Sequence, residues 1–142
     1  MRKTLVSPKE FTQSGFTSPA EEDAVPEQNL EKDLKRDPEA TYHARMGGKA
    51  MENAGIPDGA YLLFDRGITP KNGYIVYAWI DGERVIRFYE KLKDGRIRLY
   101  PASNGFPTYY IDTEFVEHSL IGVVTWSMKC LAPAYFPNVG QW

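Results

Sequence analysis

A dipeptide in the middle of the chain, Asp81-Gly82, constrains the fold more than any other feature of the sequence. Asp-Gly favours the tight turn of a two-residue β-hairpin, because both residues accept the left-handed backbone that this turn requires. Residues 74–80 before it are aromatic, β-branched or alanine, and residues 83–90 return as a second strand. Because a strand that is apolar on both faces is normally central or at an interface, we expect residues 74–80 to lie inside an antiparallel sheet.

Further strand-like runs surround this hairpin. Each has an apolar or alternating pattern typical of a strand, and they cover residues 40–46, 61–64, 96–100 and 120–126. Residues 26–38 are the one convincing helix, with Leu30 and Leu34 four residues apart and a proline at each end. Several short strands with a single helix predict a mostly-β domain, built as a compact, curved, barrel-like sheet.

Composition limits the function classes. The 142 residues are 42% hydrophobic, which is enough for one domain with a real core. The formal net charge of −2 provides no attraction for phosphate backbones, so direct nucleic-acid binding is not expected. A single cysteine, Cys130, and two histidines exclude an internal disulfide and make a zinc site improbable, and we expect neither a metal nor another cofactor.

The two ends of the chain differ from its middle. Residues 1–26 are rich in Ser, Thr, Pro and charge, which predicts a flexible arm before a β domain over residues 27–129. Residues 130–142 form an apolar, proline-punctuated tail, expected either to cover an edge strand as a strap or to dock on a partner protein. No apolar run is long enough for a membrane span or a signal peptide, so we expect a cytoplasmic protein without membrane contact.

Residues 48–65 predict a rigid platform. A crowded turn, Gly48-Lys49-Ala50-Met51, is followed by a second turn at Pro57-Asp58-Gly59 and then by an apolar strand that ends at Asp65. This arrangement presents one small residue, Ala50, on a loop held between two turns.

This platform resembles the nucleophile segment of the LexA/UmuD self-cleaving proteins, peptidase family S24, in which the pattern is Gly-x-Ser-Met. The resemblance extends over about residues 14–129, is strongest to the UmuD-like members, and implies the same curved β-fold. In the arm, residues 13–20 resemble the scissile region of those members, which implies that the bond to be cut is Ser14-Gly15. Without the resemblance, Ser14-Gly15 is an ordinary flexible joint.

The resemblance implies a serine nucleophile and a neutral lysine as general base, and both positions are substituted here. The serine position holds Ala50, and counting from the hairpin turn places the lysine position at Arg87. Alanine has no nucleophilic atom, and a guanidinium with a pKa above about 12 cannot accept a proton near neutrality. Lys49 or Lys91 could serve as a base in principle, but the loop offers no serine to activate.

Further departures favour natural degeneration over a single engineered substitution. Ala60 and Tyr74 stand where the family usually has aspartate. Arg87 leaves two alternatives open: it is buried against a carboxylate or carbonyl, or it points outward and pairs with a surface acid.

Three functions are consistent with these features. The resemblance implies a UmuD-like, non-catalytic subunit of SOS-response error-prone (translesion) DNA synthesis, forming a homodimer or a heterodimer with an active relative. It also implies a Y-family DNA polymerase and the RecA filament as partners. The alternatives are a self-cleaving Ser/Lys hydrolase whose position 50 is substituted here, and a small single-stranded nucleic-acid module, which the scattered arginines do not favour. Four aromatic residues are candidates for either interface or core: Tyr77, Trp79, Tyr89 and Tyr110.

Overall fold

The computed structural model describes residues 29–140, which belong to two compact units divided between Leu34 and Lys35. In the first unit, helix α2 (Leu30–Leu34) begins after Asn29, whose side-chain oxygen accepts a hydrogen bond from the Glu31 backbone N–H at 3.0 Å. This cap satisfies one of the free donors at the start of the helix. The helix is shorter than the predicted span of residues 26–38, the first three of which lie outside the described residues.

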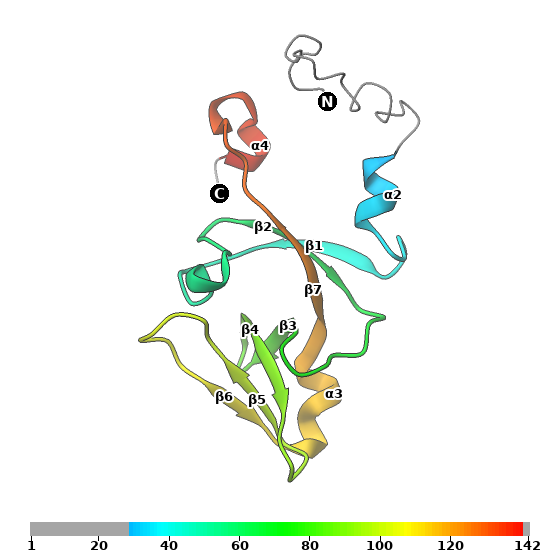
Figure 1. Ribbon diagram of the computed structural model, residues 1–142, viewed down its shortest axis with the longest axis vertical. Coiled ribbons are helices and arrows are strands. Elements are labelled where there is room, and N and C mark those ends of the chain that lie inside the picture. The colour runs from blue at the N-terminus through cyan, green and yellow to red at the C-terminus, as the bar shows by residue number, and fades with distance from the viewer. Residues whose placement is uncertain (1–28, 141–142) are drawn as a thin grey trace, which may run out of the picture. The chain divides into compact units, whose positions relative to one another are not determined.

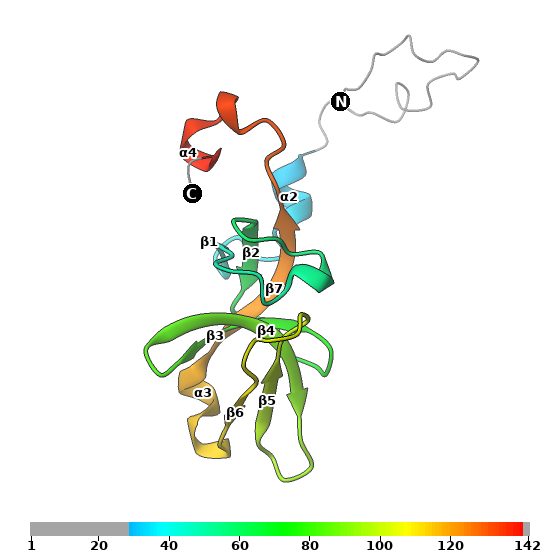
Figure 2. The ribbon, with the colours of Figure 1, turned by 90° about the vertical axis from the view of Figure 1, so that its left-hand side faces the viewer.

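The second unit is built on one seven-stranded antiparallel sheet that curls into a half-barrel (Figures 1 and 2). The strands are β1 (Thr41–Arg45), β2 (Tyr61–Asp65), β3 (Ile75–Ile80), β4 (Glu83–Lys91), β5 (Ile97–Tyr100), β6 (Tyr109–Ile111) and β7 (Leu120–Met128). Their order across the sheet is β1-β2-β7-β3-β4-β5-β6. The predicted mostly-β, curved fold is confirmed.

The hairpin predicted at Asp81-Gly82 is present. Asp81 and Gly82 have φ values of 50° and 82°, so both occupy the left-handed region that the predicted turn requires. Strand β3 lies between β7 and β4, as its two apolar faces predicted. Several short elements were not predicted, among them the 3-10 helix η1 (Glu52–Ala54), β6, the 3-10 helix η2 (Thr113–Phe115) and the helix α3 (Val116–Ser119).

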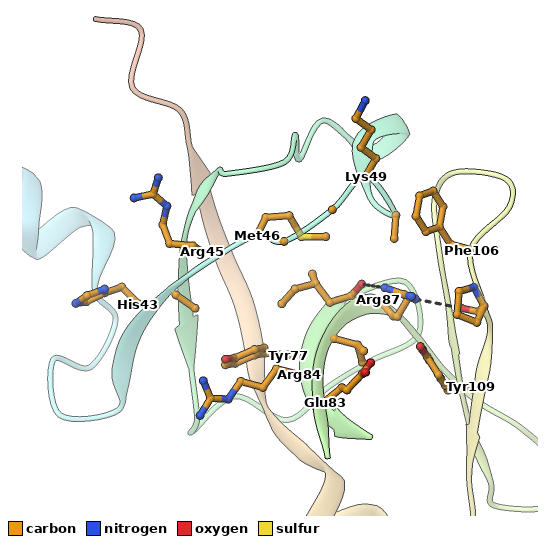
Figure 3. Close-up of a pocket in the computed structure, with 17 residues that line it drawn as sticks. His43, Arg45, Met46, Lys49, Tyr77, Glu83, Arg84, Arg87, Phe106 and Tyr109 are labelled. Atoms are coloured by element: carbon orange, nitrogen blue, oxygen red, sulfur yellow. Dashed lines mark hydrogen bonds between the residues drawn. The ribbon is translucent and has the colours of Figure 1, made fainter. Parts of the chain in front are cut away.

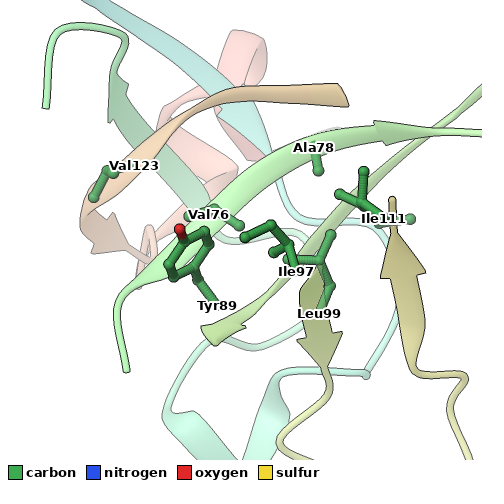
Figure 4. Packing of buried hydrophobic residues seen from close by; sticks show 8 residues of the cluster. Val76, Ala78, Tyr89, Ile97, Leu99, Ile111 and Val123 are labelled. Atoms are coloured by element: carbon green, nitrogen blue, oxygen red, sulfur yellow. The ribbon is translucent and has the colours of Figure 1, made fainter. Parts of the chain in front are cut away.

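The core consists of two clusters, to which β4 contributes from its two faces. The first cluster contains Val76, Ala78, Val85, Tyr89, Ile97, Leu99, Ile111 and Val123 (Figure 4). The second contains Met46, Ala50, Met51, Ile56, Ala60, Leu62 and Ile86. Because successive strand residues point to opposite faces, Val85 and Tyr89 enter the first cluster and Ile86 enters the second. The platform loop is therefore packed directly against β4.

Gly122 on β7 lies opposite Tyr77 on β3 and has little space around it for a side chain. A methyl group added there would approach the Phe64 ring to 2.9 Å and the Asp65 carbonyl oxygen to 3.0 Å. We therefore expect Gly122→Ala to lower the free energy of unfolding by about 1–3 kcal/mol, measured by urea denaturation. Gly47→Ala is the matched control, because no atom lies within 4 Å of its added methyl, and an equal loss in both variants would contradict the explanation.

The C-terminal tail contains the 3-10 helix η3 (Pro133–Tyr135) and the helix α4 (Pro137–Gly140). A strap over an edge strand would bury its apolar side chains, whereas Leu131, Tyr135 and Phe136 are 86%, 83% and 53% exposed. The strap prediction is therefore wrong for this part of the chain. None of the helices within residues 29–140 combines the length and the hydrophobicity that a membrane span requires.

Candidate active site

The platform loop connects β1 to β2 and is held by hydrogen bonds between its two turns. The Gly48 N–H donates to the Asp58 carboxylate at 2.8 Å, and the Gly59 N–H donates to the Met46 carbonyl at 2.7 Å. Gly48 has φ 87°, a conformation that most side chains disfavour. Met51 is fully buried and anchors the loop in the second cluster. The loop is thus held as the sequence predicted.

Ala50 joins the platform to the loop that follows β5. Its carbonyl accepts hydrogen bonds from the backbone N–H groups of Ala102 at 2.9 Å and Ser103 at 3.0 Å. The Ser103 hydroxyl in turn accepts a hydrogen bond from the Asn53 N–H at 3.1 Å. These contacts tie the Ala50 carbonyl to the loop after β5, and Ala50 as a residue is only 4% exposed.

Arg87 is buried, which decides between its two predicted orientations. The residue is 5% exposed, its Nη1 donates to the Ile86 carbonyl at 2.9 Å, and its Nε donates to the Pro107 carbonyl at 3.2 Å (Figure 3). The guanidinium carbon also lies 5.2 Å from the centre of the Tyr109 ring. Burial lowers the pKa of Arg87 from its ordinary value, and the neighbouring Tyr109 hydroxyl opposes that shift.

The Arg87 side chain covers an open edge of β4. Strand β5 pairs only with Phe88–Lys91, so the first half of β4 has no strand neighbour on that side among the described residues. The Tyr89 N–H donates to the Tyr74 carbonyl beside β3, so the odd-numbered residues of β4 direct their backbone groups toward β3. The even-numbered residues of β4 therefore direct theirs away from β3. The Ile86 carbonyl is one of these outward groups, and Arg87 satisfies it.

The platform, the first half of β4 and the loop before β6 enclose a cleft of about 620 Å³ (Figure 3). Four of the predicted site residues line it together: Gly48, Lys49, Ala50 and Arg87. Met51 lies beneath the loop in the core and is not part of the lining. Lys91 is exposed at the far end of β4, also outside the lining, and Ser14-Gly15 lies outside the described residues. The structure therefore places Ala50 and Arg87, the two positions that the resemblance predicts as the dyad, in the lining of one cleft.

Most of the remaining cleft wall was not predicted from the sequence. The added side chains come from β1, β3, β4, β6 and the loop before β6: His43, Arg45, Tyr77, Glu83, Arg84, Phe106 and Tyr109. Cationic side chains outnumber carboxylates in this lining. The cations are Arg45, Lys49, Arg84 and Arg87, and the one carboxylate among the described lining residues is Glu83. No local motif marks these residues, since they meet only when the sheet curls.

The chemistry of the lining is limited. None of the described residues that line the cleft is serine, threonine or cysteine, the usual hydroxyl and thiol nucleophiles. The described part of the chain has no group of three or more His, Cys, Asp or Glu residues that could hold a metal ion. Ala60 and Tyr74, the other two departures from the family pattern, do not line the cleft.

Three of the arginines that could suggest a phosphate-binding surface are engaged by neighbouring side chains. Arg84 lies over the Trp79 ring at 5.4 Å, Arg96 pairs with Asp94 at 2.9 Å, and Arg98 pairs with Glu90 at 2.7 Å. Arg87 is buried. These contacts weaken the alternative of a nucleic-acid module.

Comparisons of the sequence with known proteins identify a family and several relatives. Residues 9–125 match the family model described as Peptidase S24-like. The chain is 39% identical to Protein MucA of Salmonella typhimurium over 115 residues, which are 81% of this chain and 77% of MucA. It is 36% identical to Protein ImpA of Shigella flexneri over 115 residues (80% and 75%), and 33% identical to the LexA repressor of Desulfatibacillum aliphaticivorans over 85 residues (58% and 41%). This chain is therefore a member of the peptidase S24 family.

Proposed function

We propose that this chain is a UmuD-like subunit of SOS-response error-prone (translesion) DNA synthesis and a pseudo-protease that acts by binding other proteins. Its similarity to MucA and ImpA over about four fifths of its length supports the first part. The second part is carried by one observation: Ala50 and Arg87 line the same cleft, where the family resemblance expects a serine and a lysine.

Neither side chain can perform the chemistry expected at its position. The Ala50 methyl group has no lone pair with which to attack a carbonyl. The Arg87 guanidinium is a hydrogen-bond donor at both nitrogens that contact the protein, and a general base must accept a proton instead. The cleft can therefore hold an extended segment of chain but supplies neither of the groups needed to cut it.

The retained sequence around Ser14-Gly15 gives the cleft a ligand within this proposal. The arm, residues 1–26, docks there from the same chain or from a second copy, and the β domain over residues 27–129 provides the dimer contacts. The partners proposed by resemblance are an active UmuD-like relative, a Y-family DNA polymerase and the RecA filament. The tail, residues 130–142, is a further docking segment, consistent with its exposed Leu131 and Tyr135.

A cleavage assay tests this proposal directly. The purified chain is incubated overnight at about pH 10, alone and mixed with an active UmuD-type relative, and mass spectrometry covers Ser14-Gly15. We expect the chain alone to stay intact while the relative cuts itself under the same conditions. A cut in the chain alone would favour the alternative of a self-cleaving hydrolase. A cut only in the mixture would show that the pseudo-protease is processed by its partner.

A further inference from the structure

A second groove, of about 500 Å³, lies between the β3–β4 turn, strand β6 and the η2–α3 segment. Figure 2 shows β6 between α3 and β5 at this end of the sheet. Its principal lining side chains are Trp79, Asp81, Tyr110, Asp112, Phe115 and His118. The proposed function assigns no role to this surface.

Three aromatic rings around this groove are unusually exposed. Trp79 is 43% exposed, Tyr110 is 54% exposed and Phe115 is 51% exposed. Single exposed rings are common on protein surfaces, but several around one groove indicate an interaction site. Tyr89, a candidate interface residue from its sequence, is instead buried in the first cluster.

The groove has a negative lining. Asp81 and Asp112 are exposed and line it, and no lysine or arginine does so. Its rings already attract guanidinium groups of the same chain, because Arg84 lies 5.4 Å from the Trp79 ring centre and Arg96 lies 5.3 Å from the Tyr110 ring centre. Carboxylates beside aromatic faces are the surroundings that a cationic side chain prefers.

At this groove the outer side of β6 has no strand neighbour among the described residues. Among the described residues, β6 pairs only with β5, in the register Arg98 opposite Tyr110. The Leu92 N–H donates to the Arg96 carbonyl, so the even-numbered residues of β5 direct their backbone groups toward β4. The backbone groups of Ile97 and Leu99 therefore point toward β6, where they pair with Ile111 and Tyr109. Tyr110 lies between these two residues, so its N–H and C=O point away from β5.

We propose that this groove docks an extended, basic segment of a partner protein, which adds as a strand along β6. Its backbone bonds to Tyr110, and its arginine or lysine side chains lie against Asp81, Asp112 and the neighbouring rings. Backbone pairing provides the affinity, and the charged and aromatic contacts select the sequence. The inference rests on the proposed function in one respect, that the chain acts by binding proteins.

The test uses the full chain, labelled with ¹⁵N, and a blocked peptide of sequence Thr-Arg-Val-Leu-Val-Arg-Thr. A second peptide with glutamate in place of both arginines is the control. We expect the basic peptide to shift the amide signals of Gly82 and Tyr110 and the indole signal of Trp79. Asp81→Asn combined with Asp112→Asn should weaken its binding about tenfold, while Glu39→Gln, at an exposed acid outside the groove, should not change it. Asparagine also tolerates the left-handed conformation of residue 81, so this variant is expected to fold.

Three results would overturn the inference. The first is that the glutamate peptide binds as well as the arginine peptide. The second is that the signal shifts map to the cleft at Ala50 and Arg87, and the third is that no binding occurs at millimolar peptide. None of these outcomes alters the result of the cleavage assay, so failure of the groove and failure of the pseudo-protease proposal are distinguishable.

Discussion

The double variant Ala50→Ser, Arg87→Lys is expected to cut its own chain between Ser14 and Gly15, whereas the parent chain and each single variant stay intact. The serine would supply a hydroxyl on the cleft wall, and a lysine at a position only 5% exposed would lose its proton more easily than in water. Loss of either the nucleophile or the base costs on the order of a millionfold in rate, which explains the inactive single variants. The restored rate should rise with pH as the lysine deprotonates, up to about pH 10.

The measurement is a time course by mass spectrometry from about pH 7 to about pH 10. Ala50→Ser with Arg87→Met is the matched control, because methionine fills similar space without offering a base. Cleavage by Ala50→Ser alone would mean that Arg87 does not stand at the base position, and Lys49, which also lines the cleft, would be the next candidate. A folded double variant that never cuts would contradict the assignment of both positions.

The sequence was sufficient for those parts of the molecule that depend on local patterns. The Asp81-Gly82 turn fixed the β3–β4 pairing, and the two apolar faces of β3 placed it inside the sheet. The platform was also predictable, because its glycines and Pro57 carry the constraints of both turns. The expectation that Arg87 lies near the platform came from the family resemblance and not from a local pattern, and the structure places Arg87 in the same cleft lining as Ala50.

The rest depends on contacts between segments that are far apart in the sequence. Strand β6 has three residues, too few for a period to be seen, yet it forms the edge of the second groove. The loop after β5 satisfies both the Ala50 carbonyl, through its N–H groups, and the Arg87 side chain, through the Pro107 carbonyl. Nothing in Pro101–Pro107 predicts these bonds. Burial of Arg87 was undecidable from sequence for the same reason, because its partners are main-chain carbonyls that any residue provides.

One such long-range contact, between Arg36 and Asp65, should contribute to the stability of the β domain at neutral pH. Arg36 Nε and Nη2 donate to the two oxygens of Asp65 at 3.0 Å and 2.9 Å, and the Gly67 N–H donates to the same carboxylate at 2.7 Å. The Asp65 side chain is 1% exposed while that of Arg36 is 54% exposed. We expect Arg36→Ala to lower the melting temperature more than Asp65→Asn does, because it leaves a buried charge without its cation, whereas an unpaired Arg36 can be solvated.

The hydrogen bonds from Arg36 lower the pKa of Asp65, with smaller contributions from the backbone N–H groups of Gly67 and Ile68, and this shift determines the pH dependence. The stabilisation is complete above the ordinary aspartate pKa of about 4 and is lost as the pH falls through the lowered value. Urea unfolding of the parent chain and Asp65→Asn, from about pH 7 to about pH 3, should therefore show a difference in midpoint that shrinks with acidification. Arg96→Ala is the matched control, since its pair with Asp94 joins side chains that are 43% and 56% exposed and should change stability little. A midpoint difference that stays constant over this range would show that Asp65 is held by packing and not by its charge.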